Sequence, residues 1–162
     1  MTPARPAQPV SIASPADAEA IAAMSRRLIE HGLPWTWQPQ RVARAIASPV
    51  TNVAVLRGQA GLEAFGIMEY WDEDAHLVLF AVQPARQRSG LGSALLDWLE
   101  ASALVAGSTR IRVEARRDNT PARSFYNQHG YHERAIQPQM YSDTLDGIRM
   151  EKWLRGGDAG AA

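Results

Sequence analysis

A glycine turn, ARQRSGLGS at residues 85–93, lies between the apolar run LVLFAV (77–82) and the helix-like segment ALLDWLEAS. Glycines at such a junction let several backbone N–H groups approach one ligand at the positive end of the helix dipole. An anion is the ligand that this arrangement favours. A plain turn that binds nothing uses the same residue types, so the glycines alone leave both interpretations open.

Two common phosphate-binding motifs do not fit this turn. A nucleoside-triphosphate loop needs Lys and then Ser or Thr after its second glycine, but Gly92 is followed by Ser93 and Ala94. The chain has a single lysine, Lys152, far from the turn. A dinucleotide loop needs a small residue three positions after Gly92, where Leu95 stands. We therefore do not expect ATP or NAD to bind here.

The composition predicts a soluble, single-domain protein over about residues 10–154, with flexible ends at 1–9 and 155–162. The 162 residues are 46% hydrophobic and carry no formal net charge, which argues against binding to nucleic acid or to an acidic membrane surface. No cysteine is present, and the four histidines lack metal-ligand spacing, so no metal is expected. No run approaches the roughly 20 apolar residues of a membrane helix, which predicts a cytoplasmic location.

Hydrophobic periodicity and turn residues divide the chain into helices and strands. Helices are predicted from Ser14-Pro15 to Gly32, over about 38–46, after the glycine turn, and from Asn119 or Thr120 to Gly130. Strands are predicted near 52–56, 62–71, 75–82, 110–115, 131–136 and 148–154, with 137–147 as a loop. A helix joins 77–82 to 110–115 in a parallel step, whereas short breaks join the other strands, so the sheet should be mixed.

Two motifs flank the strand predicted at 110–115. The first is QRSGLG at 87–92, and the second is NTPARSFY at 119–126, followed by Gly130 and Tyr131. Together they resemble the acyl-coenzyme A loop, Q/R-x-x-G-x-G/A, and the N-x-x-A-x-x-F-Y helix of the GNAT superfamily of N-acetyltransferases. The resemblance covers about residues 10–154. It implies an α/β fold with a mixed sheet of about seven mostly antiparallel strands, one parallel pair and four helices.

The resemblance implies acetyl-coenzyme A as the bound substrate, with its pyrophosphate on the backbone N–H groups of the glycine turn. Main-chain groups near Phe80 and Val82 are expected to hold the pantetheine arm. Arg86, Arg88 and Arg123 are candidates for additional contacts to phosphate, and the sequence does not decide among them. The implied binding residues are Val82, Gln87, Arg88, Ser89, Gly90, Leu91, Gly92, Ser93, Asn119 and Tyr126.

The catalytic roles are also implied by the resemblance. Tyr126 matches the general acid that protonates the departing thiolate, and the Phe80 N–H matches the group that meets the oxyanion. Many family members carry a glutamate base four residues before that position, where this chain has His76. An imidazole is able to accept the proton, and the period of two places His76 on one strand face with Phe80. Glu69, Glu114 and a water chain remain alternative proton routes.

An acceptor pocket is expected from aromatic and acidic residues, which would suit a cationic amine or a peptide N-terminus. Its members are Trp35, Trp37, Tyr70, Trp71, Asp72-Glu73-Asp74 and Tyr141. The function implied is transfer of the acetyl group to a primary amine, either a small molecule or a peptide amine, by direct attack in a ternary complex. A non-catalytic acyl-coenzyme A sensor is the alternative. A homodimer is a further expectation from the resemblance.

Overall fold

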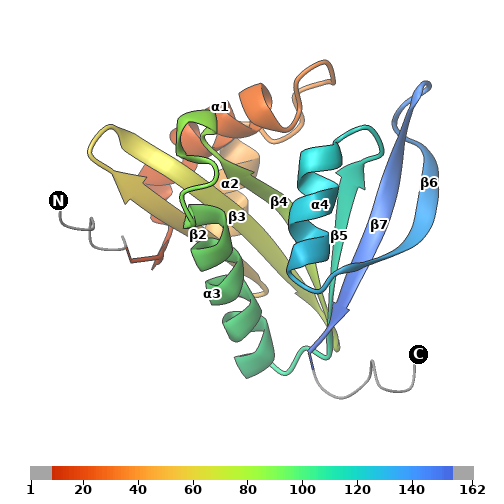
Figure 1. The fold of residues 1–162 in the computed structure, drawn as a ribbon. Coiled ribbons are helices and arrows are strands. Elements are labelled where there is room, and N and C mark those ends of the chain that lie inside the picture. Colours follow the sequence, from red (N-terminus) through yellow and green to blue (C-terminus); the bar gives the residue numbers. More distant parts are fainter. Residues whose placement is uncertain (1–8, 155–162) are drawn as a thin grey trace, which may run out of the picture.

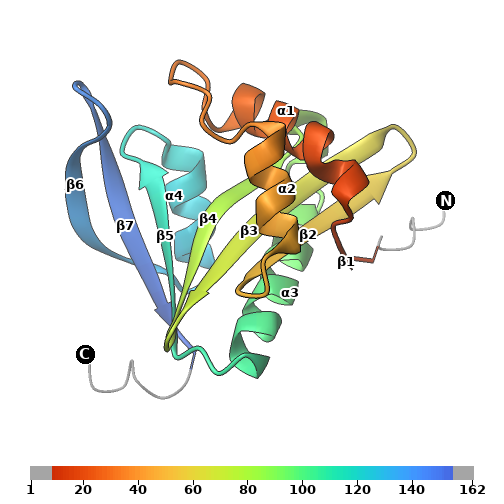
Figure 2. The ribbon, with the colours of Figure 1, turned by 180° about the vertical axis from the view of Figure 1, so that it is seen from behind.

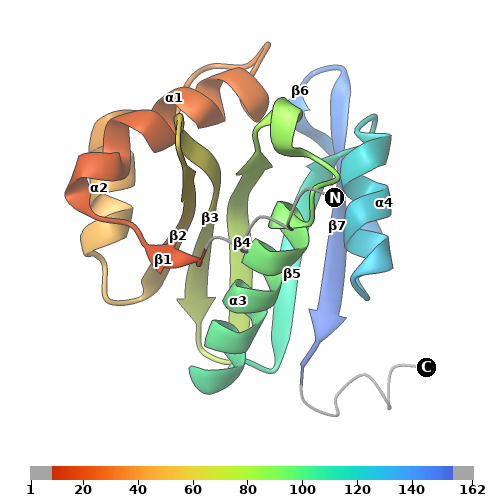
Figure 3. The same cartoon turned by 60° about the vertical axis from the view of Figure 1, so that its left-hand side comes forward.

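The computed structural model describes residues 9–154, in which one seven-stranded sheet separates two layers of helices (Figures 1 and 3). The expected flexible ends lie outside the described residues, apart from Pro9. In chain order the elements are β1 (Ser11–Ile12), α1 (Ala18–Leu28), α2 (Pro39–Ala47), β2 (Thr51–Gly58), β3 (Gly61–Trp71), β4 (Asp74–Val82), α3 (Leu91–Val105), β5 (Arg110–Arg116), α4 (Thr120–Gln128), β6 (His132–Ser142) and β7 (Leu145–Trp153).

The sheet is mixed, as predicted. Its strand order is β1-β2-β3-β4-β5-β7-β6. The β4–β5 pair is parallel, and the other described pairs are antiparallel. The parallel pair follows from the α3 crossover, whereas tight hairpins join β2 to β3, β3 to β4 and β6 to β7.

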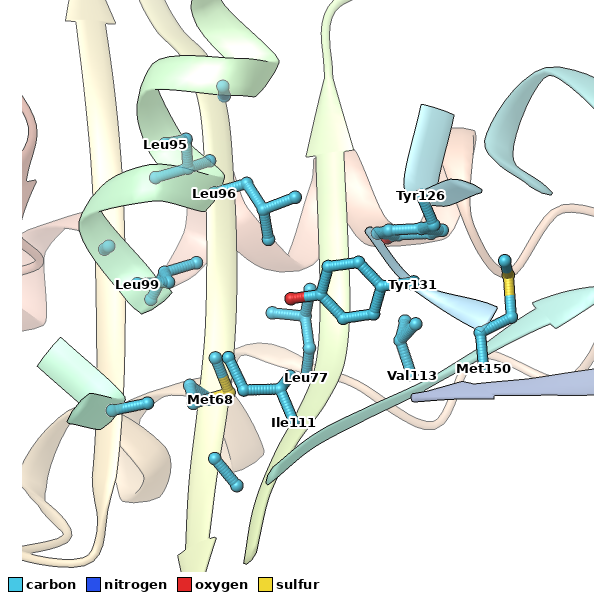
Figure 4. Packing of buried hydrophobic residues seen from close by; sticks show 14 of the residues in the cluster. Met68, Leu77, Leu95, Leu96, Leu99, Ile111, Val113, Tyr126, Tyr131 and Met150 are labelled. Atoms are coloured by element: carbon cyan, nitrogen blue, oxygen red, sulfur yellow. The ribbon is translucent and has the colours of Figure 1, made fainter. Parts of the chain in front are cut away.

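Each face of the sheet is covered by its own pair of helices. α3 and α4 lie on one face, and α1 and α2 lie on the other (Figures 1 and 2). α3 buries Leu95, Leu96 and Leu99 against the sheet, beside Tyr126 and Tyr131 (Figure 4). No helix in the described part of the chain is long and apolar enough to cross a membrane.

The predicted helix starts are confirmed by their caps. The Ser14 backbone N–H donates to the Asp17 carboxylate at 2.8 Å, at a short 3-10 turn that leads into α1. Asn119 caps α4, because its side-chain oxygen accepts a hydrogen bond from the Ala122 N–H at 3.2 Å. After α1 the chain turns at Gly32, which has a left-handed φ of 77°.

The parallel pair is short, and this opens the sheet. Register pairs join Asp74–Leu77 of β4 to residues 110–113 of β5 and go no further. Beyond these residues the two strands diverge toward their carboxyl ends, and α4 lies over the diverging strands (Figure 1). A gap in the hydrogen bonding between neighbouring strands exposes main-chain donors and acceptors of both.

A β-bulge in β4 overturns one expectation. Met68 pairs with Leu77 and Ile67 pairs with Leu79, so Val78 is an extra residue on β4. Leu77 and Phe80 consequently face α3 and α4, while His76 points to the opposite face. The prediction that His76 and Phe80 share a strand face was therefore wrong, because the bulge interrupts the period of two between them.

The end of the chain also differs from the prediction. Residues 137–142, predicted as part of a loop, extend β6, which pairs with β7 in a long hairpin. β6 is an edge strand, where Pro138 removes no essential ladder hydrogen bond. The register is irregular between Gln137 and Ser142, and Gln139 has a φ of 52°, so the segment lacks a regular strand pattern. The two-residue β1 was not predicted at all.

Candidate functional site

The glycine turn presents free backbone donors at the start of α3. Gly90, the N-cap, has a φ of 87°, a left-handed conformation that suits glycine. The helix ladder begins with the Ala94 N–H donating to the Gly90 carbonyl at 3.0 Å. The N–H groups of residues 91–93 therefore have no acceptor within the helix. They lie at the positive end of the α3 dipole, which is a suitable place for an anion.

The side chains of the turn bond back to the turn itself. The Ser89 hydroxyl donates to the Arg86 carbonyl, and the Gln87 amide donates to the Val82 carbonyl at 3.2 Å. These contacts hold the segment between β4 and α3 in one conformation. Gln87 and Ser89 thus shape the turn, while its backbone supplies the donors.

The structure separates the three arginine candidates for phosphate binding. Arg123 makes two hydrogen bonds to the Glu133 carboxylate, at 2.8 and 3.1 Å. Arg86 lies 3.5 Å from a Glu63 carboxylate oxygen. Arg88 is exposed, has a left-handed φ of 62°, and forms no ion pair with another described residue. Arg88 is therefore the arginine left available beside the turn.

Close packing brings the turn against α4. A Cβ atom on Gly92 would lie 3.4 Å from the Phe125 ring and 3.5 Å from Val82. The Ser93 hydroxyl lies 3.0 Å from His129 Nε2, and that imidazole also bonds to the Phe125 carbonyl at 2.8 Å through Nδ1. The start of α3 and the end of α4 are thereby fixed relative to each other.

The main chain of β4 faces the opening between β4 and β5. The Gln83 N–H donates to the Glu63 carbonyl of β3 at 2.8 Å. Ladder bonds alternate along an antiparallel pair, and the register is continuous from Gln83 back to Leu79. The N–H and C=O groups of Phe80 and Val82 consequently point away from β3, toward the side that β5 leaves open.

Tyr126 lies beside that opening, on the α3 and α4 face of the sheet. Its ring is 5% exposed and packs edge-on against Phe80, at 6.2 Å between ring centroids, and against Tyr131, at 5.6 Å. Burial raises the pKa of the Tyr126 phenol well above its usual value, and the neighbouring Tyr141 raises it further. The hydroxyl is therefore protonated at any physiological pH.

His76 and Glu114 form a pair on the opposite face. His76 Nε2 lies 2.5 Å from a Glu114 carboxylate oxygen, and the two side chains are 33% and 17% exposed. They bridge β4 and β5 next to the last register pair of these strands. Glu69, the other carboxylate considered as a base, is the register partner of His76 on β3 and accepts a hydrogen bond from Trp71 at 3.3 Å. The structure thus joins two of the alternative proton acceptors in one contact.

A cleft of about 820 Å³ leads from the β3–β4 turn to this pair. It is lined by Trp71, Asp72, Glu73, Asp74, His76, Thr109, Arg110, Arg112, Glu114 and Trp153. A second cleft, of about 460 Å³, shares Trp71 with the first and lies against α2. Trp37 and Tyr70 line the second cleft. An acceptor molecule therefore has an open route to His76 and Glu114.

Two expected pocket residues line neither cleft. The Trp35 indole donates to the Ala22 carbonyl at 3.2 Å and belongs to the packing of α1. Tyr141 lies near the Arg116 guanidinium, at 5.8 Å from its ring, and also close to Tyr126 and Glu114. Burial raises the pKa of the Tyr141 phenol to about 12, and the Glu114 carboxylate contributes to this rise. The Arg116 guanidinium also donates to the His31 carbonyl at 2.8 Å, so the segment after α1 is tied to the end of β5.

Comparison with known proteins identifies the family. The model of the acetyltransferase (GNAT) domain matches residues 23–154. The chain belongs to the GNAT superfamily of N-acetyltransferases. An uncharacterised N-acetyltransferase of Methanocaldococcus jannaschii is 34% identical over 101 residues, which are 62% of this chain and 64% of that protein. The ribosomal protein bS18-alanine N-acetyltransferase of Escherichia coli is 34% identical over 83 residues, or 51% of this chain and 56% of that enzyme. The matched segments thus span less than two thirds of either relative.

Solved GNAT structures share the fold over more of the chain. The crystal structure of the Escherichia coli ribosomal-protein-S18-alanine N-acetyltransferase has a TM-score of 0.78 and 26% identity, covering 94% of this chain and 98% of that one. The PaiA N-acetyltransferase of Thermoplasma acidophilum, solved with coenzyme A, has a TM-score of 0.76 and 16% identity, covering 91% of this chain and 99% of that one. The predicted GNAT fold is confirmed.

Sequence reasoning missed Arg110 and Arg112, the arginines that line the larger cleft. Arg110, Arg112 and Arg116 alternate with buried residues along β5, and with Glu114 they share one face of the strand. The period-two alternation in RIRVEAR carried that signal. The pairing of Arg110 with Asp74 on β4 and with Glu151 on β7 depends on strand order, which the sequence does not state.

Proposed function

We propose that this GNAT protein transfers the acetyl group of acetyl-coenzyme A to a primary amine by direct attack within a ternary complex. The observation that carries the proposal is the opening between β4 and β5, with free N–H groups at one end and proton-transfer candidates on both faces. The amine nitrogen forms a bond to the acetyl carbon, the carbon–sulfur bond breaks, and coenzyme A leaves as the thiol.

The residues present fit acetyl-coenzyme A. In this proposal the N–H groups of residues 91–93, with Gly90 and Arg88 beside them, bind the pyrophosphate. Main-chain groups of Phe80 and Val82 bond the pantetheine arm, and the Phe80 N–H meets the developing oxyanion. A thioester held there supplies an activated acyl group. Asn119 acts through the position of α4, because its side chain is already used as the helix cap.

Proton transfer in this proposal uses both faces of the sheet. His76, supported by Glu114, accepts the proton that the attacking ammonium must lose. Tyr126 donates a proton to the departing thiolate. Its raised pKa keeps the phenol protonated, and it makes full transfer to sulfur less favourable than an ordinary phenol would. The donated hydrogen bond is therefore its main contribution.

A peptide α-amine is the second form of acceptor that the relatives support. The named function of the Escherichia coli relative is acetylation of an alanine of ribosomal protein bS18. The open route to His76 past Trp71 would admit an extended chain end as well as a small amine. Both acceptor classes belong in the first experiment.

The experiment is a calorimetric titration with acetyl-coenzyme A, followed by assays of thiol release with small amines and short peptides. Saturable binding with acceptor-dependent thiol release supports the proposal. Binding without turnover on any amine would favour the acyl-coenzyme A sensor instead. Failure to bind at millimolar concentration would mean that the glycine turn is only structural.

A further inference from the structure

One face of β5 is left uncovered by helices, and it is strongly charged. α1 and α2 lie over β2, β3 and β4, whereas no helix covers β5 and β7 on that side (Figure 2). Arg110, Arg112 and Glu114 project from β5 into the larger cleft beside His76. A charged wall next to the reacting amine will select acceptors by their charge.

Two acids beside this wall, Asp74 and Glu151, are already paired with arginines. Arg110 makes two hydrogen bonds to the Asp74 carboxylate, at 2.8 and 3.0 Å, and a third to Glu151 at 3.0 Å. Arg149 lies 3.4 Å from the other Glu151 oxygen. The bonds from Arg110 lower the pKa of Asp74. Asp74, one of the acids expected to attract a cationic amine, is therefore neutralised by the protein itself.

Arg112 is a cation of the same cleft to which no carboxylate of the described residues is hydrogen-bonded, although its charge helps to lower the pKa of Asp74. It stands in register between His76 on β4 and Glu151 on β7. Glu151 is bound by Arg110 and Arg149, and His76 by Glu114. Among residues 9–154 no group bonds the Arg112 guanidinium, and its Nε is buried without an acceptor. Because Arg112 also lines the larger cleft, an anionic ligand there would meet a guanidinium to which no carboxylate is hydrogen-bonded.

We propose that Arg112 binds a carboxylate of the acceptor, while the amine of the same molecule lies at His76. The inference rests on the proposed function. Neighbouring strands are separated by roughly 4.8 Å, which matches a carboxylate a few bonds from the nitrogen. A guanidinium fork binds a carboxylate through two parallel hydrogen bonds. The acceptor class is thus a free amino acid, or a peptide whose first residue is acidic.

The test compares acceptors that differ only in the carboxylate. Phenylalanine is paired with phenethylamine, and Asp-Ala-Ala amide is paired with Asn-Ala-Ala amide, in assays of acetyl-coenzyme A-dependent thiol release. We expect kcat/KM to favour the carboxylated member of one pair by roughly tenfold or more, the usual size of a hydrogen bond to a charged group. The pair that shows the preference identifies the source of the carboxylate.

Substitution of Arg112 decides whether this residue causes the preference. Arg112→Gln should reduce the ratio of kcat/KM between the two acceptors of a pair to the value that their intrinsic amine reactivities give. We expect this through a higher KM for the carboxylated acceptor and little change for the other. Arg112→Lys should retain part of the preference, because it keeps the charge and loses the fork. Arg44→Gln, an exposed arginine of the smaller cleft, is the matched control and should leave the ratio unchanged. Unchanged acetyl-coenzyme A affinity shows that each variant is folded.

Two results would overturn the inference. One is a wild-type protein that acetylates amines with no preference for either carboxylated member. The other is a preference that survives Arg112→Gln.

Calorimetry of the same acceptors with coenzyme A present separates this inference from the proposed function. Arg112-dependent binding of a carboxylated amine without turnover supports the site and refutes the enzyme, whereas absence of both binding and turnover refutes both.

Discussion

His76 stands at the position where the resemblance to the GNAT superfamily implies a glutamate base. We predict that His76→Gln lowers kcat/KM for the amine by roughly 10²-fold at neutral pH, because general-base catalysis contributes about that much. The acetyl-coenzyme A affinity should not change, since His76 lies on the opposite face from Phe80 and Tyr126. The measurement is thiol-release kinetics of the wild type and the variant at neutral pH, with calorimetry of acetyl-coenzyme A binding on the same preparations.

Glu69 provides the matched comparison for His76. It is the carboxylate in register with His76 on β3, and it bonds to Trp71 rather than to the imidazole. Glu69→Gln should leave kcat/KM for the amine as it is in the wild type. If Glu69→Gln lowered kcat/KM by the factor expected for His76→Gln and His76→Gln did not, the base would be Glu69 and the His76–Glu114 pair would be structural.

Tyr126 is tested by removal of one oxygen atom. Tyr126→Phe should lower kcat by about tenfold to a thousandfold and leave the affinity for acetyl-coenzyme A almost unchanged. The ring keeps its contacts with Phe80 and Tyr131, so the fold is not expected to change. Steady-state kinetics and calorimetry on one preparation measure both quantities. An unchanged kcat would remove Tyr126 from the proposed mechanism.

At the scale of elements, the turn before α3 and the turn after it permit a controlled comparison. Gly90 and Gly107 have φ values of 87° and 94°, and a Cβ atom on either would meet nothing within 4 Å. Gly90→Ala and Gly107→Ala should therefore each destabilise the protein by roughly 1 kcal/mol through backbone strain alone.

Only the Gly90 variant should weaken acetyl-coenzyme A binding, because Gly107 lies at the far end of α3. Urea unfolding and calorimetric titration on both variants check the two expectations. An equal loss of affinity in both would mean that global stability, and not the shape of the glycine turn, controls binding of acetyl-coenzyme A.

The elements that the sequence predicted are those with strong local signals. Helix caps at Ser14 and Asn119, and the glycine turn, depend on neighbours within a few residues. The bulge at Val78 is different, since an extra residue on β4 is visible only against its partner strand. The irregular part of β6 likewise depends on pairing with β7. Local pattern thus predicted which elements form, and strand pairing decided which faces their residues occupy.

The same division explains the site. Tyr126 and the turn residues 87–93 were readable because they lie in contiguous motifs. The His76–Glu114 contact and the unpaired state of Arg112 were not readable, because each depends on which strand lies beside β5. The acids at 72–74 were expected to suit a cationic amine, but Arg110 of β5 already binds one of them, Asp74. Charge in a cleft is a property of pairing, not of composition.

For the whole molecule, the two faces of the sheet divide the proposed tasks. The α3 and α4 face holds the turn and Tyr126, which act on the acyl donor, whereas the open face holds the residues proposed to bind the amine. The two faces meet where β4 and β5 separate, and this separation begins at Val78, two residues after His76. The bulge at Val78 lies at the same level, so the change of face and the opening of the sheet occur together.

The pH dependence of stability is also a property of the whole molecule, because all four tyrosines have raised pKa values. Burial is the main cause at Tyr70, Tyr126, Tyr131 and Tyr141. Unfolded tyrosines ionise near pH 10, below their folded counterparts, so the unfolded state loses protons first as the pH rises. Between pH 8 and 9 these tyrosines should leave the free energy of unfolding unchanged, and above pH 10 they should lower it by up to about 1.4 kcal/mol per tyrosine per pH unit. Urea unfolding between pH 8 and 11 measures this slope, and Tyr131→Phe should reduce it by one tyrosine's share. A flat profile to pH 11 would show that the phenols are more accessible to water than their burial indicates.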